Sequence, residues 1–279
     1  MKKIIAAFDG LNFSESAKDY AIFMAQHMNA HLVGVFLEDF TRHSYSVTDI
    51  TKYAGTFDEQ IEKLNHRDKD ARDAAVSFFE QDCQYAGIHF SVHRDKNIAL
   101  FDLLHESVYS DLLIIDRKET LTRYEEIPPT RFVRDLLTDL QCPALVVPSQ
   151  YKTFEQVVLL YDGEPSSVFA AKMFSYLMPS LKTMSTLILS AKKEGENSHL
   201  PENKLMKEFM KRHYPKAEYI VVKGFVEDKI VSFIAGQEKE SLVVLGAYRR
   251  GRMSRLFRPS MADVLMNHLQ LPLFIAHNK

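Results

Sequence analysis

Apolar runs of strand length alternate with stretches of helical period along the whole chain of 279 residues. The strand-like runs are almost continuous in Val, Ile and Leu, as in residues 242–245, and do not alternate with polar residues. Such runs are typical of parallel strands that helices cover on both faces. The pattern therefore predicts an α/β fold of the doubly wound, Rossmann-like type.

The same pattern occurs twice. An apolar strand ends in Asp9-Gly10 near the start of the chain, and residues 156–163 repeat it with Asp162-Gly163. Helix-starting residues, an apolar helical face and further strands follow each copy in the same order. Because self-similarity of this kind marks a duplicated domain, we predict two tandem domains, residues 1–150 and 151–279. Each is expected to hold a five-stranded parallel sheet, and the two to pack as a pseudo-dimer.

The last strand of each copy follows a proline, in Cys142-Pro143 and in Leu271-Pro272. Both strands are apolar, and an exposed apolar edge would attract other chains. Pairing of the two copies through these strands would hide both edges. We therefore expect an intramolecular partner contact there, with association of two chains as a further expectation.

The first copy is longer than the second between its second and third strands. We place the additional residues around 40–65, where residues 41–46 read as a loop, and expect a lengthened helix over about 57–85. Insertions of this kind decorate a surface or form a lid.

Charge, cysteine spacing and missing motifs argue against several classes of function. The net charge of -2 and the pI near 6.6 give no global reason to expect nucleic acid or an anionic membrane as partner. Cys83 and Cys142 have no metal-ligand spacing, and no apolar run reaches the length of a membrane helix, so a reduced cytoplasmic protein is expected. Hydrolase elbows, zinc-protease motifs and P-loops are also absent from the sequence.

A basic loop in the second copy is the strongest chemical signal. The strand that ends at Gly246 opens into an acid-free loop with five arginines, which closes at Pro259-Ser260. Glycine allows a tight turn, and Ser260 can cap a helix whose free N–H groups favour an anion. Three uses of the loop stay open: a phosphate clamp, a docking patch for an acidic partner, or a solvated surface.

The order of elements resembles the universal stress protein family, here as a tandem of two domains. The resemblance rests on the Asp-Gly ends of the first strands, the Gly246 loop and the 13-residue step from Pro259 to Pro272. It implies five-stranded parallel sheets that pair through the last strand. In nucleotide-binding members, Gly-x2-Gly-x9-Gly followed by Ser or Thr holds the phosphates and ribose, and the aspartate after the first strand contacts adenine.

The second copy matches this motif in part. Asp162, Gly246 and Ser260 stand at matching positions, whereas Arg249 replaces the second glycine and Pro259 the third. A side chain at Arg249 obstructs a close backbone approach, but a guanidinium is also a good phosphate partner. The resemblance thus implies ATP or a related adenine nucleotide in the second domain. The expected cofactor-binding residues are Asp162, Leu245, Gly246, Arg249, Pro259, Ser260 and Met261.

The first copy departs further from the motif. Its equivalent loop, residues 116–130, has no glycine, and four acids there would repel phosphate: Asp116, Glu119, Glu125 and Glu126. Asp9 keeps the adenine-side position, where its simpler role is to cap the adjacent turn. We expect this copy to be a structural partner.

The resemblance thus implies a non-enzymatic stress-response sensor, which we expect to bind a nucleotide in its second domain. The alternative is an interaction module that has lost its ligand and acts through surface patches. A slow nucleotide hydrolase is a third reading, although no general base is apparent in the loop.

Overall fold

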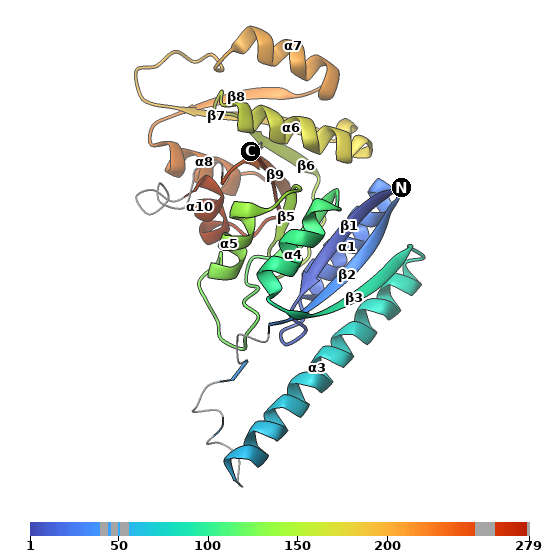
Figure 1. Cartoon of the computed structure of the whole chain (residues 1–279). Coiled ribbons are helices and arrows are strands. Elements are labelled where there is room, and N and C mark those ends of the chain that lie inside the picture. The colour runs from blue at the N-terminus through green and yellow to red at the C-terminus, as the bar shows by residue number, and fades with distance from the viewer. Residues whose placement is uncertain (40–43, 46–49, 51–55, 249–259, 278–279) are drawn as a thin grey trace. The chain divides into compact units, whose positions relative to one another are not determined.

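The computed structural model of the chain describes residues 1–39, 44–45, 50, 56–248 and 260–277 (Figure 1). Its internal contacts divide the chain into two compact units, Met1–Gln141 and Cys142–Lys279. None of the described helices combines the length and the apolar composition that crossing a bilayer demands. Both cysteines are buried and unbridged.

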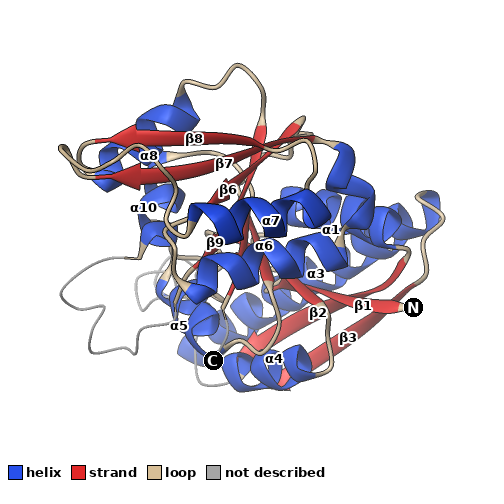
Figure 2. Ribbon diagram, turned by 90° about the horizontal axis from the view of Figure 1, so that it is seen from above, coloured by secondary structure: helices blue, strands red, loops and turns tan. Residues whose placement is uncertain are grey.

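The first unit has a parallel sheet in the order β3-β2-β1-β4. Its elements are β1 (Lys2–Phe8), α1 (Glu15–Met28), β2 (Ala30–Asp39), α3 (Phe57–Tyr85), β3 (Phe90–Asn97), α4 (Ala99–Val108), β4 (Leu112–Asp116) and α5 (Arg131–Asp139). In the centre of the sheet Ile4 lies opposite both Leu32 and Leu112. Helices α1 and α3 cover one face and α4 the other, where α4 packs against α5 (Figure 2).

The second unit repeats this arrangement, in the order β8-β7-β6-β9-β10. Its elements are β5 (Ala144–Val147), β6 (Gln156–Leu160), α6 (Pro165–Leu177), the 3₁₀ helix η1 (Pro179–Thr183), β7 (Ser185–Lys192), α7 (Asn203–His213), β8 (Glu218–Lys223), α8 (Val226–Ala235), β9 (Ser241–Gly246), α10 (Met261–His268) and β10 (Leu273–Ala276). The strands from β6 to β10 pair in parallel. The predicted α/β class with a mostly parallel sheet is confirmed.

The strand β5 is the exception to the parallel pattern. It pairs antiparallel with β10, with Leu145 opposite Phe274, and both strands are buried throughout. The second compact unit therefore begins at Cys142, ahead of the sequence repeat that starts at residue 151. The apolar side chains that follow each proline are covered by this pairing.

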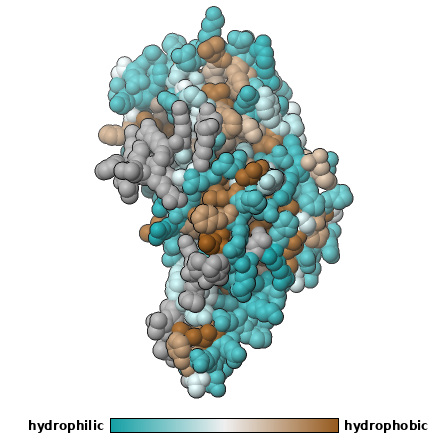
Figure 3. Space-filling model, in the orientation of Figure 1, coloured by the Kyte–Doolittle hydropathy of each residue, from teal (hydrophilic) through white to brown (hydrophobic). Residues whose placement is uncertain are grey.

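The inserted helix α3 has the bounds that the sequence predicts, Phe57–Tyr85. Thr56 caps it in a capping box with Glu59. Phe79, which is fully buried, anchors its C-terminal half, and its ring lies 5.7 Å from that of Phe8 and 5.8 Å from that of Phe36. The N-terminal half extends past the ends of β2 and β3 (Figure 1), and the surface along the helix is mostly hydrophilic (Figure 3).

Candidate functional site

Each unit has one point where successive connections leave a strand in opposite directions across the sheet. This switch point lies between β1 and β4 in the first unit and between β6 and β9 in the second. Doubly wound sheets bind ligands in the crevice outside the carboxyl ends of the strands at such a point. Asp9 and Asp116 lie at the first crevice, and Asp162 and Gly246 lie at the second.

Gly246 brings the end of β9 into direct contact with the start of α6. A Cβ atom added to it would lie 2.4 Å from the carbonyl carbon of Ser166 and 2.7 Å from the nitrogen of Ser167. No side chain fits at these distances, so glycine is required for the packing of the helix itself. Leu245, the preceding residue, is buried and pairs with Ile275 in β10. Its side chain therefore belongs to the core.

Asp162 follows β6 and is exposed. Its Oδ1 accepts a hydrogen bond of 3.0 Å from the N–H of Glu164, directly before α6. The capping role that the sequence suggests for this aspartate is confirmed. One carboxylate oxygen takes part in the turn, and the exposed group points to the same helix start that contacts Gly246.

Ser260 caps α10, as predicted. Its Oγ accepts from the N–H of Ala262 at 3.3 Å, and Asp263 Oδ2 accepts from the N–H of Ser260 at 3.2 Å. Tyr248, just after β9, donates its hydroxyl to Asp263 Oδ1. Met261 is the first residue of the helix. Sequence reasoning missed Tyr248 and Asp263, although Ser-x-x-Asp is the signature of a capping box.

Two of the predicted residues, Arg249 and Pro259, lie outside the described residues, as do the other loop arginines. The structure brings Asp162 and Gly246 together at the start of α6. It ties the start of α10, with Ser260, to the end of β9 through the bond between Tyr248 and Asp263. The phosphate clamp by arginines stays a prediction.

A neighbouring segment borders the second crevice. The hydroxyl of Tyr161 donates to the backbone oxygen of Pro201 at 3.0 Å, and a Cβ atom on Gly163 would lie 2.6 Å from the Cβ of Pro201. The chain between β7 and α7 is thus fixed beside the end of β6. Burial raises the pKa of the Tyr161 hydroxyl, and the negative charges of Glu202 and Asp162 raise it further.

The first crevice is lined by buried carboxyl groups. Asp9 is 2% exposed, and its Oδ1 accepts from the N–H of Leu11 at 2.7 Å and of Asn12 at 3.1 Å. Asp116 is also buried, and its Oδ2 accepts from the hydroxyl of Ser14 at 2.6 Å. The predicted turn-capping role of Asp9 is confirmed.

Glu119 adds a third carboxyl group to this crevice. It is 6% exposed, and it accepts from the N–H of Asp9 at 3.3 Å, of Thr120 at 3.1 Å and of Leu121 at 3.3 Å. Backbone N–H groups arranged around one acid are the donors that an anionic ligand would otherwise use. The side chain of Glu119 therefore occupies these backbone N–H donors itself.

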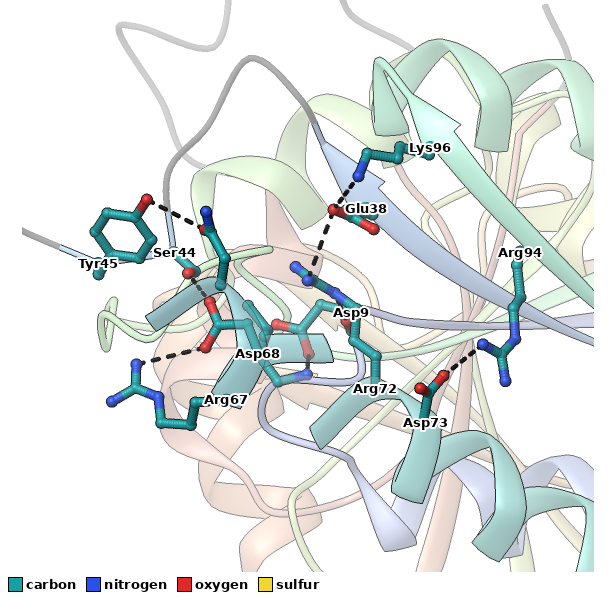
Figure 4. A network of polar contacts seen from close by, with 12 residues as sticks. Asp9, Glu38, Ser44, Tyr45, Arg67, Asp68, Arg72, Asp73, Arg94 and Lys96 are labelled. Carbon is teal, nitrogen blue, oxygen red and sulfur yellow. Dashed lines mark hydrogen bonds and ion pairs between the residues drawn. The ribbon is translucent and has the colours of Figure 1, made fainter. Parts of the chain in front are cut away.

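The inserted helix closes over the same crevice. Gly10 has a φ of +68°, and a Cβ atom there would lie 3.0 Å from the Cγ of Arg72 in α3. Arg72 also donates from Nε to the backbone oxygen of Asp9 at 3.3 Å. One turn earlier on α3 lies the buried carboxylate of Asp68, which Figure 4 shows beside Ser44 and Arg67. This carboxylate also pairs with Arg123 of the β4–α5 loop at 2.8 Å. The predicted insertion thus covers the first switch point.

Replacing Glu119 by glutamine tests this burial. Burial of the Glu119 side chain raises its pKa well above the ordinary value of 4.5, and the neighbouring carboxyl group of Asp9 raises this pKa further. A carboxyl group with a raised pKa in the folded state binds its proton more tightly there than in the unfolded chain. Its contribution to the free energy of unfolding is therefore complete below the unfolded-state pKa and falls as the pH rises from there to the folded-state pKa. This loss is about 1.4 kcal/mol per unit of pKa difference.

Urea unfolding of wild type and Glu119→Gln should therefore diverge with pH. Relative to wild type, the variant is expected to gain stability between pH 5 and pH 8. The exposed Glu125→Gln change serves as the control and should show no such trend. A constant difference between Glu119→Gln and wild type across this range would contradict the account of the buried carboxyl.

Among the described residues, no three His, Cys, Asp or Glu side chains are grouped so that they could hold a metal ion. The described part of the second crevice has an exposed carboxylate and two helix N-termini, and helix N-termini favour anions.

The chain is similar to known proteins in sequence and in fold. No family model matches the chain. A universal stress protein of Synechocystis sp. is 21% identical over 292 aligned positions, which cover 98% of each chain. The structure of a universal stress protein from Archaeoglobus fulgidus matches with a TM-score of 0.69 at 13% identity, covering 99% of this chain and 98% of that one.

A functionally unknown protein from Pseudomonas aeruginosa PAO1 matches with a TM-score of 0.60 at 12% identity, over 99% of this chain and 92% of that one. At such identities the solved structures speak for the fold alone. The sequence match, however, extends over both repeats, and the fold agrees along the same length. Along both repeats the chain is thus similar in sequence to a universal stress protein, and it has the same tandem α/β fold as another.

Proposed function

We propose that this chain is a non-enzymatic stress-response regulator whose second domain, residues 151–279, binds ATP or a related adenine nucleotide in the crevice between β6 and β9. The contrast between the two crevices carries the proposal. Buried carboxyl groups of Asp9, Asp116 and Glu119 fill the first crevice, and Glu119 occupies backbone N–H groups that a phosphate would need. The corresponding strand ends of the second crevice carry the exposed Asp162 and Gly246 instead.

Three of the predicted residues, Asp162, Arg249 and Ser260, then have a defined role in nucleotide binding. The exposed carboxylate of Asp162 accepts hydrogen bonds from the base. The N-termini of α6 and α10, the latter capped by Ser260, provide N–H groups and a positive dipole end for the phosphates. Arg249 adds a cation from the loop. In this proposal the first domain, residues 1–150, is the structural half of the chain.

An interaction module without a ligand is the second candidate. Gly246 is explained by its packing on Ser166, and Ser260 by its cap on α10, without any nucleotide. In this case the family motif would survive for structural reasons only. The inserted helix α3, with its largely exposed polar surface, would then carry the interactions.

Titration of the full chain with a fluorescent ATP analogue distinguishes the two candidates. We expect saturable binding, displaced by ATP and weakened about tenfold or more by Asp162→Ala, because hydrogen bonds to a charged group contribute about 1.5–3 kcal/mol. Ser260→Ala should weaken binding as well. Thr130→Ala, which removes the corresponding cap from α5 in the first domain, is the matched control and should leave affinity unchanged.

Absence of binding at millimolar ATP would leave the interaction module. If Thr130→Ala and Ser260→Ala weakened ATP binding equally, the loss of a helix cap would lower affinity by destabilising the fold, and Ser260 would not be a ligand contact. Phosphate release measured in the same samples tests hydrolysis. None above the buffer rate is expected of a non-enzymatic protein.

A further inference from the structure

The sheet of the second unit has an open edge at β8. All six residues of this strand, Glu218–Lys223, are exposed or half-buried, whereas β6 and β10 are buried throughout. Within the described residues β8 pairs with β7 alone, and Figure 2 shows it on the outer side of β7. The opposite side of this sheet is joined by β5, so β8 is the edge that stays uncovered in the described structure.

The backbone of β8 points alternately toward β7 and away from it. The N–H of Gly224 donates to the backbone oxygen of Lys192 in β7 at 2.9 Å. Because the polar groups of successive strand residues point to opposite sides, those of Tyr219, Val221 and Lys223 face away from β7. These outward N–H and C=O groups can pair with a further strand.

The outer strand of the first unit, β3, is protected against such pairing. Arg94 and Lys96 lie within it, and Arg94 pairs with Asp73 of α3 at 2.6 Å (Figure 4). Charged side chains on an edge strand oppose the addition of another strand. In β8 the charges stand at the two ends, Glu218 and Lys223, and the residues between them are Tyr-Ile-Val-Val, which favour strand pairing.

The geometry of β8 suits a second copy of the same strand. Opposed residues of an antiparallel pair exchange hydrogen bonds, so outward-facing residues must oppose outward-facing ones. A two-fold axis at Val221 meets this condition, because Val221 then opposes its own copy and Tyr219 opposes Lys223. The antiparallel orientation also brings the Glu218 end of one strand to the Lys223 end of the other. Parallel pairing would instead place like charges together.

We propose that two copies of the chain associate through antiparallel pairing of β8 with β8, about a two-fold axis at Val221. Each copy contributes a strand of six residues, so the interface is small and the dimer forms reversibly. The strand β7 lies between β8 and β6 in the sheet, and the dimer edge is therefore separate from the crevice between β6 and β9.

Sedimentation of the full chain without nucleotide tests this edge. We expect the mass to rise from 32.1 kDa toward twice that value between micromolar and millimolar concentration. Val221→Pro should weaken association about tenfold or more, because it removes the central N–H donor from both copies. Edge strands accept proline where the N–H faces outward, so the variant is expected to keep the fold, which circular dichroism checks.

Val92→Pro in β3 is the matched control. The N–H of Leu32 in β2 donates to the oxygen of His89 at 2.9 Å, so the backbone groups of Val92 face away from β2. This variant removes an outward N–H from the other outer strand and should associate like wild type. Equal weakening by Val92→Pro and Val221→Pro would overturn the proposal, as would a monomer at millimolar concentration or undiminished association of Val221→Pro.

A pair of charge variants tests the partner and the register, and it leaves the backbone unchanged where Val221→Pro does not fold. Val221→Lys and Val221→Asp each place like charges across the two-fold axis, so each alone should associate more weakly than wild type. An equimolar mixture places Lys opposite Asp and should associate several-fold more tightly than either variant alone. A mixture that associates no better than the separate variants would overturn the pairing of Val221 with its own copy.

Discussion

Replacing Phe79 by alanine is expected to lower the free energy of unfolding by about 3–5 kcal/mol, as for other buried aromatic residues. Phe79 is fully buried, and its ring contacts those of Phe8, Phe36 and Phe90. A Cβ atom on Gly34 would lie 2.7 Å from the ring, so β2 follows the shape of this side chain closely. Removing the ring would leave a cavity between α3 and the sheet.

Phe78 provides the matched control. It is the preceding residue on the same helix, but it is 59% exposed. Phe78→Ala should therefore change the unfolding free energy by no more than about 0.5 kcal/mol. Urea unfolding followed by circular dichroism measures both. A loss below 1 kcal/mol for Phe79→Ala would show that α3 does not pack on the sheet as described.

Replacing Gly246 by alanine is expected to destabilise the fold by about 1–3 kcal/mol or more. The added methyl group would lie 2.4 Å from the carbonyl carbon and 2.5 Å from the oxygen of Ser166. These are backbone atoms of the first turn of α6, so no rotation of a side chain relieves the overlap. Either α6 or the end of β9 has to move.

Gly236 serves as the control in thermal unfolding of the same domain. A Cβ atom there would lie 3.3 Å from the nearest oxygen, that of Ser232, and the residue has a φ of -84° that alanine adopts freely. Gly236→Ala should thus unfold close to the wild-type temperature, whereas Gly246→Ala should unfold well below it. Equal unfolding temperatures for all three proteins would refute the close approach at Gly246. If Gly246→Ala is destabilised as expected, loss of nucleotide binding in that variant would not by itself identify a ligand contact.

The sequence predicted the α/β fold, the duplication and the bounds of α3, because these follow from the hydrophobic period and from the repeat along the chain. It also predicted that acids of the first loop oppose a phosphate. It did not predict that Glu119 folds back onto the N–H groups of Asp9 and Leu121, because that depends on a local loop path.

In the second crevice, too, the sequence predicted the positions of residues but not their contacts. The motif placed Asp162, Gly246 and Ser260 at strand and helix ends, where the structure has them. That Gly246 packs on α6 could not be read from sequence, because the contact joins residues that are 80 positions apart along the chain. The role of Arg72 likewise requires knowing that α3 crosses the end of β1.

Hydrogen–deuterium exchange of the full chain with and without ATP tests the central claim most directly, because it reports both crevices in one sample. We expect slower exchange on ATP addition at the starts of α6 and α10, in peptides that contain Ser166 or Ser260. Peptides that contain Asp9 or Glu119 should exchange at unchanged rates. Protection of the first crevice by ATP, or of neither crevice, would contradict a nucleotide site confined to the second domain.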